Sequence, residues 1–286
     1  MSKLYVTNSR GELEPFSFRK VWSSARRAGA PSKVATQIAL TIQNEATNGI
    51  KTGEIFRKVK EMLIGYDYTS ALRFNLKEAI KKLGPSGFPF EKFMAEVFYN
   101  LGYHTSLNQQ IRGKCVSHEI DFIAENDSEI IIAECKYRIS SGERVDVKNC
   151  LSNYAKFLDL KEGYFKNSKK PLSMFLITNA KFTNQAIKYG KCVGLELLGW
   201  RYPADGGIET MVESQDLYPV TILPSFKGIL TNMLSSHGTM LVKDILNVNV
   251  DKLAKHVDVP KSKLLPLIDE AKILMEQNGK KKIKLG

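Results

Sequence analysis

Two carboxylates and a lysine occupy positions from which they could act together on one substrate. Asp121 lies in an alternating, strand-like segment, and Glu134 and Lys136 end a strand that begins with the apolar run Ile130–Ala133. If the two segments form one β-hairpin centred between residues 127 and 128, positions 121 and 134 face each other, with Cβ atoms about 5 Å apart. Lys136 shares the face of Glu134, because alternate side chains of a strand point the same way.

Like charges at such a distance are unfavourable unless something compensates them, and a divalent cation is the natural candidate. Mg²⁺ prefers oxygen ligands, which both carboxylates supply. The sequence therefore predicts a metal site at the end of a buried strand. Glu119 is a competing acid on the strand face of Asp121, whereas the Cys135 side chain alternates away from the site and is expected in the core.

The elements that must position these residues alternate between helical and strand patterns. Before the hairpin, apolar residues at 90, 93, 94, 97, 98 and 101 fit one face of a helix. Glu91 begins this helix, where a carboxylate favours the positive end of the helix dipole. After the hairpin, the pattern predicts helices over 146–157 and 179–190 and strands over 172–178 and 193–198. This alternation predicts an α/β fold with a mixed sheet packed between helices.

Helical segments flank this central unit on both sides. The first segment begins with a hairpin over residues 3–15 and continues, after the N-cap Ser17, with helices over 20–28, 31–47, 52–65 and 69–82. The last segment predicts helices over 225–236, 240–247, 250–257 and 260–277. Gly84-Pro85-Ser86-Gly87 is a linker signal. We therefore expect three domains, over residues 1–84, 85–215 and 216–286.

The net charge of +12 is unevenly distributed along the 286 residues. Residues 1–84 carry 15 basic and 7 acidic side chains, residues 85–215 carry 16 of each, and residues 216–286 carry 11 and 7. A basic balance suits polyanions such as nucleotides or DNA, although basic surfaces also aid solubility. The central segment is electrically neutral, so the flanking segments are expected to supply most of the attraction for a polyanion.

The sequence shows no sign of a membrane or secreted protein. No apolar run approaches the roughly 20 residues of a membrane span, and the N-terminus lacks the apolar region of a signal peptide. The four cysteines are widely spaced and form no C-x-x-C pair, which argues against a zinc ribbon and favours reduced thiols. We expect a cytoplasmic protein with no membrane partner.

The order of helix, aspartate, hairpin and E-x-K resembles the PD-(D/E)XK nuclease superfamily. Glu134 lies thirteen residues after Asp121 and two before Lys136. The preceding helix looks like that of the Mrr-type branch of type IV restriction endonucleases and of the archaeal-type Holliday junction resolvases. The match runs from about residue 88 to 200 and includes Thr178–Phe182 and Gly199-Trp200. It implies a restriction-endonuclease-like α/β/α fold.

This resemblance implies metal-dependent hydrolysis of DNA phosphodiester bonds. Asp121, Glu134 and the backbone carbonyl of Cys135 would bind Mg²⁺ or Mn²⁺, which polarises the phosphate and lowers the pKa of a bound water. Lys136 would orient that water or neutralise developing negative charge. Glu91 would hold a metal-bound water or a second cation, unless its role is only to complement the helix dipole.

Residues 1–84 resemble the ATP-cone, a small regulatory nucleotide-binding domain. The resemblance rests on Val6, Gly11, Glu14-Pro15-Phe16, Lys20-Val21, Ile50–Ile55 and Ala71. It implies that the hairpin and first helix cradle the phosphates of ATP or dATP, with nucleotide contacts assigned to Val6, Asn8, Arg19 and Lys20. Asn8-Ser9 stand where the family usually carries two basic residues, so Lys3, Arg10 or Arg19 would supply the missing charge. A cone that has lost its ligand and serves as a docking surface is the alternative.

Together these patterns predict a Mg²⁺-dependent DNA endonuclease that is regulated by an adenine nucleotide and forms a homo-oligomer. Two alternatives stay open: a nucleotide-responsive DNA-binding protein with a vestigial nuclease site, and an enzyme like the Holliday junction resolvases. The C-terminal helices look like a module of the helix-hairpin-helix or helix-turn-helix type. Their lysine-rich end, over residues 278–284, could contact phosphate or be a solvated tail.

Overall fold

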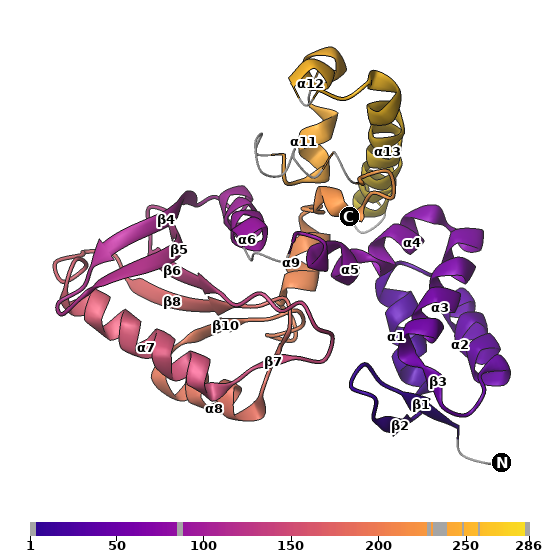
Figure 1. The fold of residues 1–286 in the computed structure, drawn as a ribbon, viewed down its shortest axis with the longest axis horizontal. Helices are drawn as coiled ribbons and strands as arrows, with labels where there is room; N and C mark the ends of the chain where they lie inside the picture. Colours follow the sequence, from indigo (N-terminus) through magenta and orange to yellow (C-terminus); the bar gives the residue numbers. More distant parts are fainter. Residues whose placement is uncertain are drawn as a thin grey trace.

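The computed structural model describes residues 4–84, 88–227, 230, 239–247, 249–256 and 258–283. Lys3, the linker residues 85–87 and most of the expected helix over 225–236 lie outside the described residues. The chain has the mixed α/β architecture that the sequence predicts, with a mostly helical N-terminal part, a central sheet and a C-terminal group of helices (Figure 1).

The N-terminal part combines a small sheet with five helices. Strand β1 (Tyr5–Thr7) pairs antiparallel with β2 (Leu13–Pro15) and parallel with β3 (Ile50–Lys51), a short strand that the sequence pattern does not predict. The Ser17 hydroxyl accepts a hydrogen bond from the backbone N–H of Lys20 at 3.3 Å, which confirms Ser17 as the N-cap of the first helix. The helices are α1 (Phe18–Arg27), α2 (Ser32–Glu45), α3 (Thr52–Tyr66), α4 (Tyr68–Phe74) and α5 (Leu76–Lys81).

The prediction of a single helix over residues 69–82 is wrong, because the chain forms the two helices α4 and α5 there. Asp67 accepts hydrogen bonds from the N–H groups of Thr69 and Ser70 and so starts α4. At Asn75 the N–H group donates to the carbonyl of Leu72, three residues back rather than four. This tighter turn ends α4 and redirects the chain into α5.

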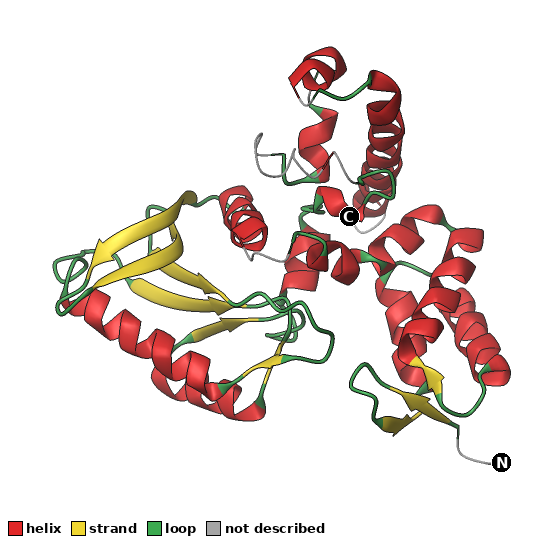
Figure 2. Ribbon diagram, viewed as in Figure 1, coloured by secondary structure: helices red, strands yellow, loops and turns green. Residues whose placement is uncertain are grey.

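The central sheet has five strands in the order β10-β8-β6-β5-β4 (Figure 2). Its strands are β4 (His104–Arg112), β5 (Ser117–Glu125), β6 (Ile130–Cys135), β8 (Leu172–Ile177) and β10 (Glu196–Leu198). The pairs β4–β5 and β5–β6 are antiparallel, whereas β6–β8 and β8–β10 are parallel, so the sheet is mixed as predicted. Phe122 pairs with Ala133 and Ile123 with Ile132, which is the predicted hairpin register.

Helices cover both faces of this sheet. Helix α6 (Phe88–Asn100) packs on one face, while α7 (Val147–Glu162) and α8 (Asn184–Val193) pack on the other (Figure 1). Alternation along β6 separates the two layers: Ile131 and Ala133 join the core that includes α6, and Ile130 and Ile132 join the core under α7 and α8. A short parallel pair, β7 (Arg144–Val145) and β9 (Lys181–Phe182), lies beside the carboxyl ends of the sheet strands.

The C-terminal part contains α9 (Ile208–Ser214), the 3₁₀ turn η1 (Val220–Ile222), α11 (Val242–Leu246), α12 (Val250–His256) and α13 (Lys261–Ile283). The last three correspond to the helices predicted over 240–247, 250–257 and 260–277, whereas α9 and η1 are not predicted. Within the described residues, no helix is long and apolar enough to cross a membrane.

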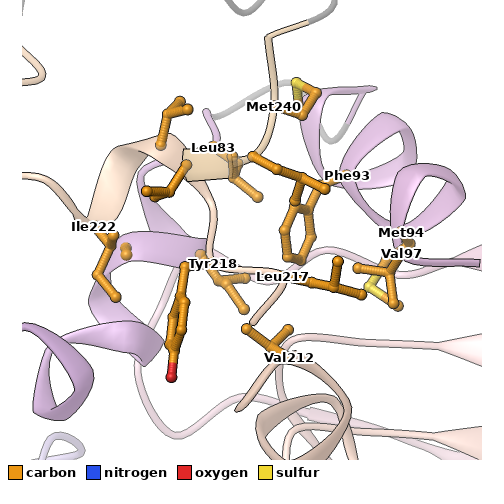
Figure 3. Close-up of a cluster of buried hydrophobic side chains, with 14 of the residues drawn as sticks. Leu83, Phe93, Met94, Val97, Val212, Leu217, Tyr218, Ile222 and Met240 are labelled. Carbon is orange, nitrogen blue, oxygen red and sulfur yellow. The ribbon is translucent and has the colours of Figure 1, made fainter. Parts of the chain in front are cut away.

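The largest buried core joins side chains from all three parts of the chain (Figure 3). Leu83 follows α5, Phe93 comes from α6, and Tyr218 and Ile222 come from the segment that follows α9. A hydrogen bond reinforces the packing, because the Thr221 hydroxyl donates to the carbonyl of Ala79 at 2.7 Å. The N-terminal helices have a separate core of their own around Ile38, and the layer under α7 and α8 has a third.

Candidate active site

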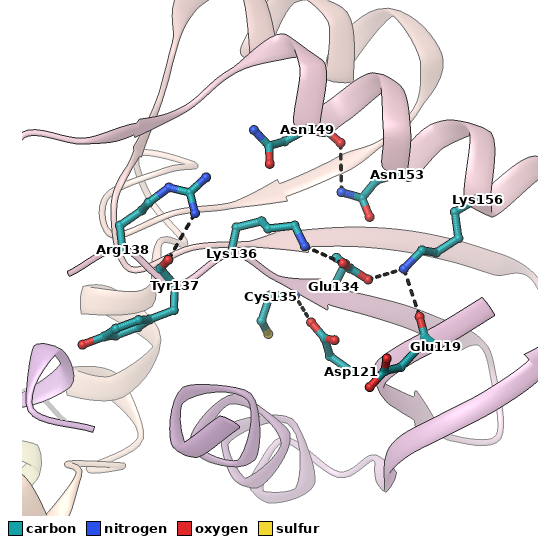
Figure 4. Close-up of polar contacts among 10 residues, drawn as sticks. All are labelled: Glu119, Asp121, Glu134, Cys135, Lys136, Tyr137, Arg138, Asn149, Asn153 and Lys156. Carbon is teal, nitrogen blue, oxygen red and sulfur yellow. Dashed lines mark hydrogen bonds and ion pairs between the residues drawn. The ribbon is translucent and has the colours of Figure 1, made fainter. Parts of the chain in front are cut away.

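The two predicted carboxylates lie where β5 and β6 separate (Figure 4). The ladder between these strands ends at the pair Phe122 and Ala133, so Asp121 and Glu134 would form the next pair. Instead, the Cys135 N–H donates to Asp121 Oδ2 at 2.6 Å. The Asp121 side chain thus takes the place of a ladder carbonyl, which fixes its carboxylate beside the end of β6. The Cys135 side chain is buried in the core, as predicted.

Glu134 is buried, and both of its carboxylate oxygens are paired with lysines (Figure 4). Lys136 Nζ lies 2.6 Å from Oε1, and Lys156 Nζ lies 2.6 Å from Oε2. Lys156 also donates to the carbonyl of Glu119 at 2.9 Å, so it spans the tips of β5 and β6. The Glu119 side chain is exposed and has no basic nitrogen of the described residues within 4.0 Å, which leaves Asp121 as the acid beside Glu134.

Lys156 is the site residue that the sequence analysis misses. It comes from α7, whose residues Asn149, Asn153 and Lys156 follow one another at helical spacing on the side that faces the sheet. Asn153 is buried and donates to the carbonyl of Asn149 at 2.9 Å. A polar stripe on a helix that covers an apolar sheet was the available signal, because such a stripe must meet polar groups of the sheet.

The carboxylates strongly affect one another. Burial, and next the Glu134 carboxylate, raise the pKa of Asp121 to about 6, against the opposing effect of the Cys135 N–H. Burial raises the pKa of Glu91 to about 7, and the charges of Asp121 and Glu134 contribute to this rise. Glu91 lies in the first turn of α6, so the start of that helix is directed toward the same site. An acidic site that holds extra negative charge attracts cations.

The segment that follows β6 is held by two buried polar residues. The Thr178 hydroxyl donates to the carbonyl of Lys136 at 2.6 Å. Asn179 accepts from the Arg138 N–H at 2.8 Å and donates to the Arg138 carbonyl at 2.9 Å. Because Thr178 and Asn179 are 0% and 3% exposed, these bonds are shielded from water and fix the backbone on both sides of Tyr137.

A second polar cluster anchors the last turn of α7. Asp159 accepts hydrogen bonds from the N–H groups of Cys115 and Val116, at 2.8 and 3.3 Å. Its Oδ2 also lies 2.8 Å from His118 Nε2. These contacts hold the pKa of Asp159 well below its usual range, with the Cys115 N–H as the largest cause. His118 therefore serves the α7 anchor in this structure rather than the carboxylate site.

The donor set matches a hard cation in its chemistry. Asp121, Glu134 and the Cys135 carbonyl supply oxygen atoms, which Mg²⁺ and Mn²⁺ prefer. Burial, and next the neighbouring carboxylates, raise the pKa values of Asp121 and Glu91, and a bound cation would offset both effects. Within the described residues, no group of three or more His, Cys, Asp or Glu side chains is gathered closely enough to hold a metal ion. Glu134 would have to exchange a lysine for the cation.

The residues assigned to nucleotide binding are spread around the N-terminal hairpin. An apolar cavity of about 190 Å³ is lined by Val6 and Lys20, among others, and lies between the hairpin, α1 and α3. Lys20 Nζ lies 3.3 Å from Glu14 Oε2. Asn8 and Arg19 do not line this cavity. Asn8 instead stabilises the hairpin turn, because its Oδ1 accepts from the N–H groups of Arg10 and Glu12 at 2.9 and 3.1 Å.

Comparison with known proteins identifies relatives but no activity. No protein-family model matches the chain. An uncharacterized protein of Archaeoglobus fulgidus is 35% identical over 179 residues, which cover 63% of this chain and 98% of the relative. A crystal structure of a protein of unknown function superimposes with a TM-score of 0.56 and 32% identity, covering 65% of this chain and 97% of that one. The chain therefore belongs to the same family as the uncharacterized protein of Archaeoglobus fulgidus.

Proposed function

We propose that this protein is a Mg²⁺-dependent DNA endonuclease of the PD-(D/E)XK type. The observation that carries the proposal is the meeting of Asp121, Glu134 and Lys136 at the point where β5 and β6 separate. Helix α6 adds Glu91 to the same site, where burial and next the Asp121 carboxylate raise its pKa to about 7. Phosphodiester hydrolysis needs such a set, because it requires cation ligands beside a group that can stabilise developing negative charge.

In this proposal each residue has a defined task. Asp121, Glu134 and the carbonyl of Cys135 would hold the magnesium ion, which supplies Lewis acidity and a water of lowered pKa. Lys136 is placed by the bond from Thr178 to its carbonyl, and its ammonium group would neutralise charge on the scissile phosphate. Glu91, with a pKa of about 7, can hold or release a proton near neutral pH.

Lys156 adds a role for α7. While it is bonded to Glu134 Oε2, it compensates the buried carboxylate in the absence of a cation. If Glu134 held a divalent ion, the Lys156 ammonium group would be available for a phosphate oxygen of the substrate. The exchange keeps Glu134 compensated in both states, which is the requirement for a buried carboxylate.

The N-terminal part is proposed to regulate this site through an adenine nucleotide, ATP or dATP. The apolar cavity between the hairpin, α1 and α3 supports this assignment by its chemistry, because it could take the base while Lys20 on its wall contacts a phosphate. Its volume of about 190 Å³ would hold only part of a nucleotide. Cytoplasmic location and assembly into a homo-oligomer complete the proposal. The basic flanking segments and the absence of a C-x-x-C pair support DNA as the partner and a reducing compartment.

A second candidate is a nucleotide-responsive DNA-binding protein that does not cleave. One observation favours it: both Glu134 oxygens are held by lysines at 2.6 Å, an arrangement that is balanced without any metal. The two candidates differ in metal binding. A catalytic site binds Mn²⁺ with an affinity that Glu134→Gln abolishes, whereas a vestigial site binds no metal in either form.

Cleavage of DNA tests the first proposal directly. Supercoiled plasmid, linear duplex and a four-way junction are incubated with the protein and Mg²⁺ or Mn²⁺, with and without ATP. Asp121→Asn and Lys136→Met are expected to reduce cleavage by about 100-fold or more, because each removes a group that acts on the transition state. Glu119→Gln, which removes the exposed neighbouring acid, should retain the activity. Cleavage that survives both active-site substitutions would place the activity elsewhere, and preference for the junction would make the enzyme a resolvase.

A further inference from the structure

A second, strongly basic cavity is lined by neither Asp121 nor Glu134. Its volume is about 400 Å³, within the roughly 300–1,000 Å³ that is common for small-molecule sites. Four segments that are distant in sequence form its walls: the turn between β1 and β2, helix α5, the loop 138–144 and the segment 179–181. In Figure 1 the β1–β2 turn and the loop before β7 approach each other from opposite sides. Its basic lining residues are Arg10, Lys77, Lys81, Arg138, Arg144 and Lys181.

Positive charge in this cavity exceeds negative charge. Three carboxylates also line it, but Glu14 is paired with Lys20, which does not line the cavity. Lys81 is paired with Glu78 at 3.0 Å. In the described part of the chain, the other five basic residues have no carboxylate oxygen within the 4.0 Å of an ion pair. Several cations therefore face one space without a partner of opposite charge.

The pKa values of two lysines in the cavity are lowered by this arrangement. Burial, followed by the nearby charges of Lys81 and Lys181, lowers the pKa of Lys77 to about 8. Burial, followed by the charge of Arg144, also lowers the pKa of Lys181. The Lys77 ammonium group lies 5.9 Å from the centre of the Trp200 ring, so it makes a cation–π contact in place of an ion pair. An anion in the cavity would relieve this repulsion.

The cavity walls connect the N-terminal part to the segment that leaves the active site. The Arg10 guanidinium donates to the carbonyl of Gly142, and the Lys81 ammonium group bonds to the Ser141 hydroxyl. Gly142 has a φ of +93°, and a Cβ there would lie 3.1 Å from the Arg10 side chain, so the close approach suits glycine. The loop begins at Arg138, which Asn179 holds two residues beyond Lys136.

We propose that this basic cavity binds an oligophosphate, as the free anion or as the phosphate chain of a nucleotide. The bound anion ties the β1–β2 turn to the loop 138–144 and so to the segment that carries Lys136. Arginines and lysines are the residues that bind phosphate oxygens, and their placement on four walls suits a chain of phosphates more than a single one. The inference does not depend on cleavage, since it rests on the cavity alone. A cavity of this volume is too small to admit a DNA duplex.

Calorimetric titration with inorganic tripolyphosphate, in EDTA to exclude divalent metals, tests the binding. The wild-type protein is expected to bind with a defined stoichiometry, and Lys77→Met and Lys181→Met are each expected to weaken binding by at least about tenfold. Lys188→Met, which removes an exposed lysine of α8 remote from the cavity lining, is the matched control and should bind as the wild type does. No saturable binding, or equal losses in the control and the cavity variants, would overturn the proposal.

A second titration with ATP separates the two sources of phosphate. ATP binding that Lys77→Met and Lys181→Met weaken identifies a nucleotide as the ligand, whereas tripolyphosphate binding alone identifies the free anion. Either result supports the cavity as an oligophosphate site. If the variants lose affinity for duplex DNA and no oligophosphate binds, the cavity is part of a DNA surface and the proposal is wrong.

Hydrogen exchange tests the mechanical part of the inference. Tripolyphosphate should slow amide exchange in the β1–β2 turn and in residues 138–144, because both segments form walls of the same cavity. Asp121→Asn should show the same protection, since it leaves the cavity intact. If tripolyphosphate protects these segments in Asp121→Asn and the wild type cleaves no DNA, the nuclease proposal is wrong and the oligophosphate proposal stands. Binding without protection of residues 138–144 would refute the tie between the two segments.

Discussion

Lys156 Nζ lies 2.6 Å from Glu134 Oε2, the carboxylate oxygen that Lys136 leaves free. A helix that starts eleven residues beyond Lys136 thus completes the surroundings of a buried strand carboxylate. The contact makes α7 part of the site rather than only a cover for the sheet.

Lys156→Met is expected to lower the free energy of unfolding by about 1–3 kcal/mol, because the buried Glu134 keeps only one of its two lysines. The same change should increase the stabilisation that Mg²⁺ gives, since no lysine then competes for Glu134 Oε2. Urea unfolding with and without Mg²⁺ measures both effects. Lys148→Met, an exposed lysine of the same helix, is the control. Unchanged stability of the metal-free variant would contradict the pairing.

The pH dependence of stability follows from Asp121 and Glu91. Their folded-state pKa values, about 6 and about 7, exceed the ordinary values of 3.8 and 4.5, so the folded protein binds more protons between pH 4 and 7. The contribution of these two groups to the free energy of unfolding is therefore greatest below pH 4. It falls as the pH rises through 6 and 7. Asp121→Asn should remove part of this fall and raise the free energy of unfolding at pH 8 by about 1–2 kcal/mol.

Chemical unfolding of the wild type and Asp121→Asn between pH 5 and 8, in EDTA, measures this dependence. With a divalent metal present, stability should instead rise with pH, because cation binding needs Asp121 and Glu134 to be ionised. A wild-type profile that is parallel to the Asp121→Asn profile would show that Asp121 ionises normally.

Thr178→Val is expected to destabilise the protein by about 1–3 kcal/mol, because the carbonyl of Lys136 loses the hydrogen bond from the buried Thr178 hydroxyl. If Lys136 acts on the substrate, the rate of cleavage should fall as well. Thermal unfolding and the cleavage rate are measured on the same preparation. Ser173→Ala, in the strand β8 that Thr178 follows but without a side-chain bond to the segment after β6, should change neither. A stability equal to that of Ser173→Ala would mean that the Thr178 bond contributes little.

Asp159→Ala should lower the melting temperature, because the N–H groups of Cys115 and Val116 and the ring of His118 all lose their acceptor. Since folding lowers the pKa of Asp159, the stability that it provides is present above the unfolded pKa near 3.8 and is lost as the pH falls. Melting curves at pH 7 and pH 2.5 should therefore differ less for the variant than for the wild type. Equal pH dependence in both proteins would refute the anchor.

The sequence predicts well those features that are local. The hairpin register follows from the alternation and the turn, and the structure pairs Phe122 with Ala133 as expected. The N-cap at Ser17 likewise depends on residues within one helical turn. The break at Asn75 was missed because both of the helices that it separates have good helical patterns, and only packing decides where the chain turns.

The features that sequence reasoning misses arise from tertiary packing. The contact of Lys156 with Glu134 joins residues that are 22 apart in the sequence. It depends on which face α7 turns toward the sheet, and the sequence does not determine that orientation. The basic cavity joins Arg10 to Gly142, which are 132 residues apart. Neither separation has a periodic signature, so only the assembled fold places these groups together.

The bond from Thr221 to Ala79 brings the helix before the central sheet against the turn after it. The chain leaves α5, forms the whole sheet, and returns to pack on α5 again. A gene fragment that starts after residue 84 would therefore encode a protein with part of its interior missing. Removal of the N-terminal part would therefore open a buried core rather than only cut a linker.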